Sequence, residues 1–378
     1  MFADPLAAFA TTTHDLHHAR RAANLPFLSR RNILAHEHLI QDAMHKVIQI
    51  LKTPVVHNLQ PLILAYSEEV AWQILLKESS GLLDNTKARD EYSWPLWTLI
   101  DAVPVLRHFS WVLKMSDLIP LPFLRVASPP IAEMSRMQKD ATRKVEAFLA
   151  NPDKSGYDSI LHVIYNSSLP DSEKTEYRLS QEGFSVITAA INTTAHHIIG
   201  GVYYLVSNPD KLAKFEEALE SVNDSWTALS NHPYIRGTIK EILRLRGMAV
   251  TRTPLQSPTP LQYDNWTIPA MTPVSLSVRD ILLDPKVFEK PNEFMPERWA
   301  DETLDRYFVP FAKGPRACQG IEMAYAEMYI VLAGLFRNYS FELVDLDYDR
   351  DFKFVRDALI AMPSKESKSI RVRAIPKR

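Results

Sequence analysis

The stretch FAKGPRACQG, residues 311–320, contains the only cysteine in a chain of 378 residues. Cys318 lies between Gly314 and Gly320, although the whole chain has only 10 glycines, and a helical pattern follows directly. Backbone N–H groups at a helix start stabilise a thiolate, and glycine permits tight turns and close approach to a flat ligand. Arg316 could pair with an anionic group on that ligand. A lone cysteine can also be a small buried residue, but the full Phe-x-x-Gly-x-Arg-x-Cys-x-Gly spacing favours a metal ligand.

Composition excludes several classes of protein. The 43 basic and 45 acidic residues give a net charge of −2, which indicates neither a nucleic-acid partner nor a polybasic membrane patch. One cysteine allows no internal disulfide, so we expect an intracellular, reducing setting. The chain start lacks the features of a signal peptide. The longest apolar segment, Phe184–Val206, is interrupted by Asn192, His196 and His197 and indicates a buried helix.

Periodicity predicts a mainly α protein with a small β portion, folded as a single domain over residues 1–378. Apolar side chains recur at three- and four-residue steps up to about residue 250 and again after the cysteine. The expected helices are Ala35–Leu51, Ile131–Ala150, Ser180–Val206, Lys211–Val222, Pro233–Arg246 and Ile321–Arg337. Prolines punctuate the region after Gly247, where we expect short strands at Leu261–Tyr263, Trp266–Ile268 and Val274–Val278. The tail from Ser340 is expected to form strands and turns.

A second pattern pairs an acid with two arginines. Glu241 and Arg244 stand three residues apart and share one helix face. Arg298, within the stretch FMPERW, could complete a Glu–Arg–Arg cluster. Taken alone, such a pair is also common on solvated helices.

A third pattern lies inside the long helix, where small residues precede Asn192, Thr193 and Thr194. Hydroxyl groups there can divert backbone hydrogen bonds and open the helix locally, which would leave a polar notch for oxygen and a proton relay. The alternative is that the hydroxyls bond back to the preceding turn of an ordinary buried helix.

Together and in this order, these segments resemble the cytochrome P-450 superfamily of heme-thiolate monooxygenases, from about His17 to about Val372. The likeness is closest to fungal secondary-metabolism members of the trichodiene oxygenase kind. It is carried by Arg20–Arg31 (RRAANLPFLSRR), the Pro310–Leu343 block and Asp357–Arg371 (DALIAMPSKESKSIR).

The resemblance implies roles for individual positions. Cys318 would be the axial thiolate on heme iron, and Thr193, with Asn192 and Thr194, would form the oxygen-activation and proton-delivery site. Glu241, Arg244 and Arg298 would lock the structure behind the heme. The remaining heme contacts implied are Arg316, Arg252 and Arg21 for the propionates, His17 where the family often has Trp, and Phe311 and Gly314 in the loop.

Two groups of residues leave alternatives open. Arg20, Arg30 and Arg31 lie beside Arg21 in sequence, and so basic a stretch could be a solvated helix end. The neighbouring His196 and His197 suggest a metal site, but adjacent helix positions point in different directions and would not converge on one ion.

The sequence also departs from the family pattern. Asn192 stands where an acid is usual, and an amide cannot exchange a proton as a carboxylate does. Ala190 replaces the more usual glycine. The His17–Arg21 segment begins almost at Met1, so we expect an N-terminally truncated chain without the anchor, the first helices and part of the first sheet.

The resemblance implies a monooxygenase that inserts one oxygen atom of O2 into an apolar small molecule, such as a fungal terpenoid or polyketide intermediate. Electrons would come from a separate reductase, and the protein would be a monomer. The family implies the endoplasmic reticulum membrane, whereas a chain without an anchor would be cytosolic or peripheral. Two alternatives remain: a truncated, non-catalytic heme-binding remnant, and a heme-thiolate enzyme that catalyses a rearrangement or dehydration.

Overall fold

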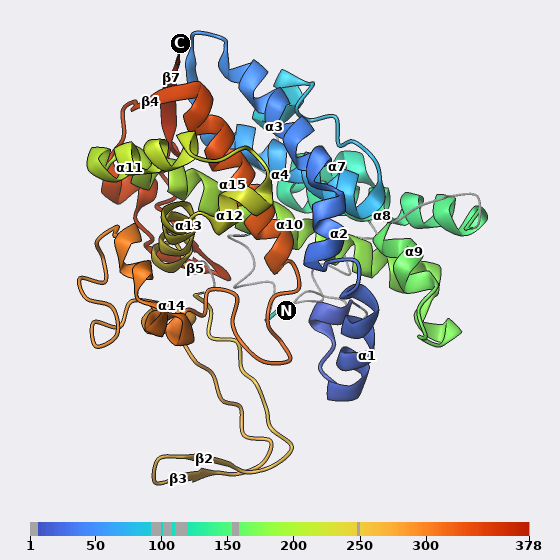
Figure 1. Ribbon diagram of the computed structural model, residues 1–378. Helices are drawn as coiled ribbons and strands as arrows, with labels where there is room; N and C mark the ends of the chain where they lie inside the picture. Colours follow the sequence, from blue (N-terminus) through green and yellow to red (C-terminus); the bar gives the residue numbers. More distant parts are fainter. Residues whose placement is uncertain are drawn as a thin grey trace.

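The structure is a computed structural model that describes residues 7–91, 100, 108–109, 119–152, 159–247 and 250–377. It is dominated by helices, as predicted, with three small antiparallel sheets (Figure 1). The α-helices are α1 (His14–Asn24), α2 (Arg30–Ala35), α3 (Glu37–Leu51), α4 (Leu59–Leu76), α7 (Leu121–Ala127), α8 (Pro129–Ala150), α9 (Ile160–Tyr165), α10 (Glu176–Val206), α11 (Pro209–Glu220), α12 (Trp226–Asn231), α13 (Pro233–Leu245), α14 (Val278–Leu282) and α15 (Ile321–Asn338). Short helical turns are η1 (Ala8–Ala10), η2 (Asp171–Glu173), η3 (Pro296–Ala300), η4 (Glu302–Tyr307) and η5 (Tyr348–Phe352).

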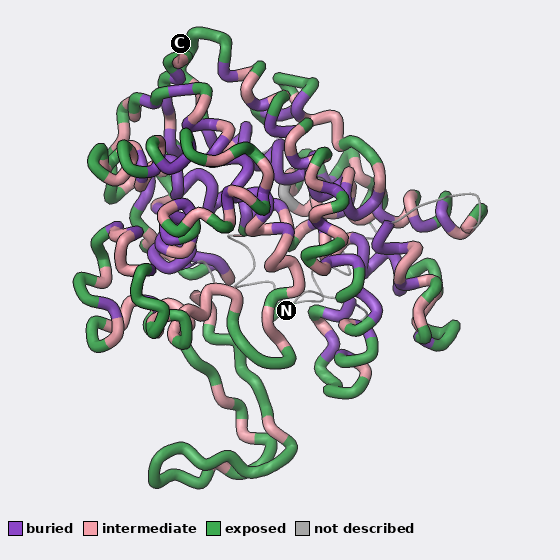
Figure 2. Tube along the Cα trace, viewed as in Figure 1, coloured by how far each residue is buried: buried purple, intermediate pink, exposed green. Residues whose placement is uncertain are grey.

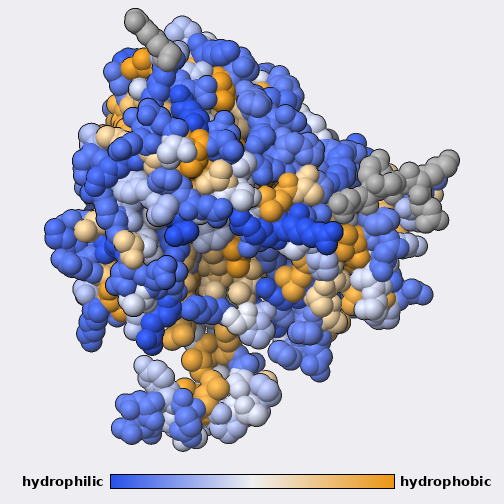
Figure 3. Space-filling model, viewed as in Figure 1, coloured by the Kyte–Doolittle hydropathy of each residue, from blue (hydrophilic) through white to orange (hydrophobic). Residues whose placement is uncertain are grey.

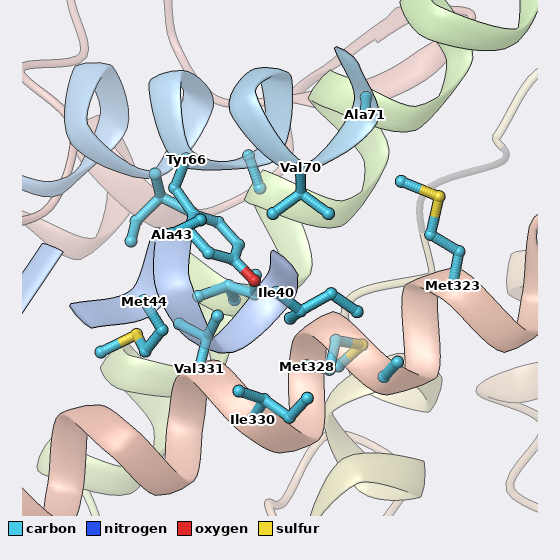
Figure 4. Close-up of a cluster of buried hydrophobic side chains, with 14 of the residues drawn as sticks. Ile40, Ala43, Met44, Tyr66, Val70, Ala71, Met323, Met328, Ile330 and Val331 are labelled. Carbon is cyan, nitrogen blue, oxygen red and sulfur yellow. The ribbon is translucent and has the colours of Figure 1, made fainter. Parts of the chain in front are cut away.

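Helices α4, α10 and α15 form the centre of the molecule, and α3 and α8 pack around them. Almost every residue of α4 is buried, Glu68 and Glu69 included, so this helix is covered by protein on all sides rather than on one stripe. Figure 4 shows side chains of α3, α4 and α15 meeting in this core, among them Ile40, Tyr66 and Val331. The purple interior in Figure 2 follows the same helices. This packing fixes α10 and α15, the two helices that carry the predicted site.

Helix boundaries differ from the predictions where a capping residue decides them. The expected helix Ala35–Leu51 divides at His36, whose φ of −103° and ψ of 7° end α2 and begin α3. Helix α10 starts at Glu176 instead of Ser180, because the Thr175 side chain accepts a hydrogen bond from Arg178 N.

The strands pair into sheets of three, two and two strands. Strand β7 (Arg371–Pro376) lies between β1 (Val56–Asn58) and β4 (Tyr339–Leu343), and both pairings are antiparallel. Strands β5 (Arg356–Ala358) and β6 (Ile360–Met362) form a short hairpin. The predicted strands in the tail are therefore confirmed, and they close the sheet against the start of α4.

Strands β2 (Leu261–Tyr263) and β3 (Trp266–Ile268) match the prediction and form the tip of a long arm, which extends from the body in Figures 1 and 2. The third expected strand, Val274–Val278, was wrong. Val274 makes only an isolated bridge to Leu255, and Val278 begins α14, which Ser277 caps. A single bridge gives the backbone too few partners to hold a strand.

Within the described ranges, no helix combines the length and the apolar character that crossing a bilayer requires.

Candidate functional site

Residues 311–320, here called the cysteine loop, form a tight turn directly before α15. Gly314 has a φ of +83°, and Ala312 also has a positive φ of 58°. The turn is closed by hydrogen bonds from Ala317 N to Gly314 O (3.0 Å) and from Cys318 N to Phe311 O (2.9 Å). Only glycine adopts the Gly314 conformation without strain, which explains this glycine in a chain with so few.

The Cys318 side chain is both accessible and set deep in the protein. By accessible surface the residue is exposed, yet burial raises the pKa of its thiol above the usual value. The N–H of Gly320 and the charge of Arg21 act in the opposite direction but do not offset that burial. The two observations agree if the thiol opens into a hollow. A Cβ added at Gly320 would meet no atom within 4 Å, so there is open space at this glycine, two residues after the cysteine.

The face shown in Figure 3 is hollowed near its centre, and hydrophobic surface (pale to full orange) lines that hollow above the stem of the arm. In Figure 1 the cysteine loop, drawn in orange-red, lies beside α1 at this level. The contact is direct, because Arg21 Nη1 of α1 donates to Ala317 O at 2.6 Å.

Three basic side chains, here called the cation cluster after its two arginines, gather at the cysteine loop: His17, Arg21 and Arg316. Arg316 Nη1 donates to Thr11 O at 2.6 Å, and burial and the charge of Arg21 lower its pKa. Burial, Arg316 and Arg21 lower the pKa of His17 to about 4. No carboxylate in the described part of the chain forms an ion pair with Arg21 or Arg316. The cluster therefore has positive charge without a protein anion.

His17 is 3% exposed. Its Nδ1 is buried and lacks a hydrogen-bond partner within the described ranges. Such an orphaned polar atom is unusual in a folded interior.

Of the two alternatives for Asn192–Thr194, the structure shows the hydroxyl that bonds back to the preceding turn. Helix α10 runs without interruption from Glu176 to Val206, and Thr193 Oγ1 donates to Ala189 O at 2.9 Å. Thr193 and Ala189 are nevertheless exposed, although they lie halfway along the central helix. Thr194 is buried. Asn192 is buried too, and its Oδ1 has no partner among the described residues.

His196 and His197, the next residues of α10 considered for metal binding, bond to their own helix. His196 Nδ1 lies 3.3 Å from Asn192 O, and His197 Nδ1 lies 2.7 Å from Thr193 O. Burial lowers the pKa of His196 to about 3 and that of His197 to about 4, so both rings are neutral near pH 7. No group of three or more His, Cys, Asp or Glu side chains within the described ranges could hold a metal ion.

Glu241, Arg244 and Arg298, here called the Glu241 cluster, meet in the interior. Arg244 Nε and Nη2 donate to the Glu241 carboxylate at 2.9 and 2.8 Å, and Arg298 Nε donates to Oε1 at 3.0 Å. Glu241 and Arg244 have no exposed surface. Backbone carbonyls, including Leu282 O at 2.9 Å, take further Arg244 donors. Each charged side chain of this cluster thus has hydrogen-bond partners within the protein.

Sequence reasoning missed two contributors to the Glu241 cluster. Trp299 Nε1 donates to Glu241 Oε2 at 3.0 Å, and its position next to Arg298 was the available signal. Gly237 lets α13 approach η3 closely, since a Cβ there would lie 2.6 Å from Pro296 O. That second contact had no signal in the sequence, because it depends on how two distant elements pack.

The remaining arginines lie in different surroundings. Arg252 is exposed and lies 3.6 Å from Asp280, and none of its described contacts reaches the cysteine loop. Arg30 covers the ring of Trp226 at 4.2 Å, and Arg31 is exposed. Arg20 is instead buried in ion pairs with Glu173, so the basic stretch is not simply a solvated helix end.

These observations fit a flat, anionic prosthetic group bound at the cysteine loop. Cys318 is accessible, there is open space at Gly320, and no carboxylate within the described ranges pairs with Arg21 or Arg316. A mainly helical fold that brings an accessible cysteine together with two arginines is what a heme-thiolate protein requires.

The comparisons give the family. The sequence profile described as Cytochrome P450 matches residues 5–369, so this chain belongs to the cytochrome P450 family. It is 32% identical over 400 residues to cytochrome P450 monooxygenase sdnE of Sordaria araneosa, covering 96% of this chain and 76% of that protein. It is 33% identical over 399 residues to tryptophan 6-hydroxylase fscE of Fusarium equiseti, covering 98% and 76%. Cytochrome P450 monooxygenase claJ of Penicillium crustosum is 30% identical over 392 residues, covering 98% and 89%.

The chain is therefore an oxidoreductase of the monooxygenase type. Its family implies a heme-thiolate cofactor, O2, a substrate and a reductase partner.

Proposed function

We propose that this chain inserts one oxygen atom from O2 into an apolar small molecule, with Cys318 as the axial ligand of heme iron. The observation that carries the proposal is the deep but accessible thiol of Cys318 beside a cation cluster that has no carboxylate partner in the described ranges. Heme, when bound, supplies the activation of O2. We further propose that residues 1–378 act as one domain and as a monomer, with electrons from a separate reductase.

The protein's own part begins with the thiol. A neutral thiol must lose its proton to become a metal ligand, so binding releases a proton and tightens as the pH rises. The start of α15 and the N–H of Gly320 stabilise the resulting anion. Arg21 and Arg316 hold the propionates, and His17, which lies close enough for both arginines to lower its pKa, is assigned to the same end of the site.

Proton delivery is assigned to α10. Thr193 Oγ1 donates to Ala189 O, and its exposed side chain can turn that hydroxyl toward a water molecule. Asn192 has a buried Oδ1 without a partner in the described ranges, and its amide cannot exchange a proton as a carboxylate would. Water that reaches Thr193 must therefore carry the proton. Thr194, which is buried, supports the helix beside them.

The Glu241 cluster is assigned a structural part. Its three side chains join α13 to the segment around η3 and are shielded from solvent. We propose that it holds the framework behind the heme and does not touch the reacting groups.

The substrate is proposed to be an intermediate of fungal secondary metabolism, of terpenoid or polyketide type. The names of the relatives support an oxygenase that acts on small molecules. They include a tryptophan 6-hydroxylase and a conidiogenone synthase, so they agree on no single substrate. The hydrophobic hollow in Figure 3 favours an apolar molecule.

The test is turnover of the heme-loaded chain under ¹⁸O2 with a fungal reductase and a panel of terpenoid and polyketide intermediates. Product that carries one ¹⁸O atom supports the proposal. Asn192 favours one rival, a rearrangement or dehydration, and an unlabelled product would support that rival. No product from any member of the panel, together with no heme binding, would support a non-catalytic remnant.

A further inference from the structure

A buried network of four charges joins α1 to the start of α10. Arg20 Nε and Nη2 donate to the two carboxylate oxygens of Glu173 at 2.6 and 2.9 Å. Arg178 Nε donates to Glu173 Oε2 at 3.2 Å, and Arg178 Nη1 lies 2.7 Å from Glu182 Oε2. The side chains of Arg20, Arg178 and Glu182 are at most 4% exposed. Two positive and two negative charges leave the network neutral.

The same network fixes the backbone before α1. Glu182 accepts hydrogen bonds from Ala8 N at 2.8 Å and from Asn24 Nδ2 at 2.6 Å. Arg20 Nη1 donates to Thr11 Oγ1 at 2.7 Å. Residues 7–24 are therefore attached at both ends to the start of α10.

Three hydrogen bonds join this segment to the cysteine loop. Arg316 Nη1 and Nη2 donate to Thr11 O and Thr12 O at 2.6 and 3.2 Å, and Arg21 Nη1 donates to Ala317 O at 2.6 Å. Thr11 thus accepts a hydrogen bond from Arg20 at its hydroxyl oxygen and one from Arg316 at its carbonyl oxygen. Neighbouring helix positions face different ways, so α1 presents Arg20 to the network and Arg21 to the loop.

We propose that Arg20, Glu173, Arg178 and Glu182 are positioning residues that set the cysteine loop and the cation cluster relative to α10. This inference rests on the proposed function of Cys318. None of the four has a described contact with Cys318, and they act through Thr11 and α1. A buried ion network adds little net stability compared with apolar packing of the same volume. Its use here is to hold one arrangement of α1, the cysteine loop and α10.

The test is hydrogen–deuterium exchange of the heme-free chain, read at the amides of Ala317 and Cys318. These amides bond to Gly314 O and Phe311 O inside the loop. In Glu173→Gln we expect exchange of both to accelerate about tenfold, the factor that losing a hydrogen bond to a charged group produces. Amides of the distant β4–β7 pair should keep their rates. In Arg20→Lys, which keeps the charge but cannot span both carboxylate oxygens, we expect a smaller acceleration.

Glu342→Gln, which removes the exposed partner of Arg373, is the matched control and should leave loop exchange unchanged. A folded Glu173→Gln whose loop amides exchange as in the parent chain would overturn the proposal. So would equal acceleration in the loop and in β4–β7, since that reports general loss of stability. If Glu173→Gln does not fold, Arg20→Lys takes its place: unchanged exchange of the loop amides, or equal acceleration in the loop and in β4–β7, would overturn the proposal.

A second readout is the reduced carbon monoxide complex of the heme-loaded protein. We expect Glu173→Gln and Arg20→Lys to show a smaller fraction of the red-shifted thiolate band than Glu342→Gln. An unchanged fraction in both variants would contradict the proposal. Exchange in the heme-free chain tests the network even if the parent chain binds no heme, so failure of this inference and failure of the proposed function remain distinguishable.

Discussion

Two clusters in this molecule each contain two arginines and differ in the partners that the protein gives them. In the Glu241 cluster, one carboxylate receives two guanidinium groups and the indole N–H of Trp299, and backbone carbonyls take further donors. Nothing is left for an outside group to complete. A buried charge with this many partners is a framework element.

The cation cluster has the opposite character. Burial and the charges of Arg316 and Arg21 lower the pKa of His17, and burial and the charge of Arg21 lower that of Arg316. The described part of the chain supplies these two arginines with backbone carbonyls but with no carboxylate. Like charges held together without a counter-charge indicate a site for an anionic ligand. The difference shows that the presence or absence of a carboxylate partner within the protein separates a structural cluster from a binding one.

The largest expected effect is a loss of folding stability when the Glu241 cluster is broken. Glu241→Gln leaves Arg244 and Arg298 buried without their counter-charge, which should lower the free energy of unfolding by about 3–5 kcal/mol. Urea denaturation of the heme-free chain measures it. The control Glu342→Gln removes an exposed pair and should change the value by about 0–1 kcal/mol. Equal changes in the two variants would refute the contrast.

A smaller effect, a loss of heme affinity, is expected when an arginine of the cation cluster is replaced. Arg316→Gln should weaken heme binding about 10- to 100-fold, because a charge-assisted hydrogen bond to a propionate is lost. Heme titration followed by the Soret band measures it. Arg252→Gln is the comparison, since Arg252 is exposed beside Asp280, and its affinity should stay close to that of the parent chain. A larger loss in Arg252→Gln than in Arg316→Gln would assign the propionates differently.

The third prediction concerns pH. The folded-state pKa of His17 is lowered to about 4 by burial, Arg316 and Arg21, so the unfolded chain binds this proton first as the pH falls. The stability that the neutral ring contributes is complete above pH 6.5 and is lost as the pH falls toward 4. His196 and His197 act in the same direction.

Unfolding free energies of the heme-free chain between pH 7 and 4 check this. In His17→Gln the fall with pH should be shallower, whereas replacing the exposed His38 by Gln should leave the slope unchanged. A steeper fall in His17→Gln would contradict the assigned direction.

The smallest expected effect is a change in the pKa of His17 when an anionic ligand binds at the cation cluster. Iron-free protoporphyrin carries the propionates without the metal, and its binding should raise the pKa of His17 above about 4. NMR titration of the histidine ring carbons, assigned with His17→Gln, follows the change. A pKa that stays the same or falls when porphyrin is bound would place the propionates elsewhere.

Much of this architecture could be predicted from sequence, because local patterns carry it. The periodicity of 321–337 and the strands at 261–263 and 266–268 depend on nearby residues, and all of them were found. Gly314 was identified because its turn needs a left-handed residue. The strand expected at 274–278 failed because strand formation depends on a partner, and Val274 has only one bridge.

The site could be predicted less completely, for the same reason. Glu241, Arg244 and Arg298 were expected to cluster, but Trp299, which follows Arg298 directly, was not recognised as a fourth partner. The burial of Arg20 and its pairing with Glu173, 153 positions away, had no local signal. Sequence patterns indicate which residues carry charge. Only the fold decides which of these charged side chains have a partner of opposite charge.

The most direct test of the central claim is the absorption spectrum of the purified, heme-loaded chain after reduction and addition of carbon monoxide. The account predicts a Soret band red-shifted in the manner of a thiolate ligand, and its complete loss in Cys318→Ser. The chain has no other cysteine that could replace the ligand. Absence of the band in the parent chain, or its survival in Cys318→Ser, would contradict the account.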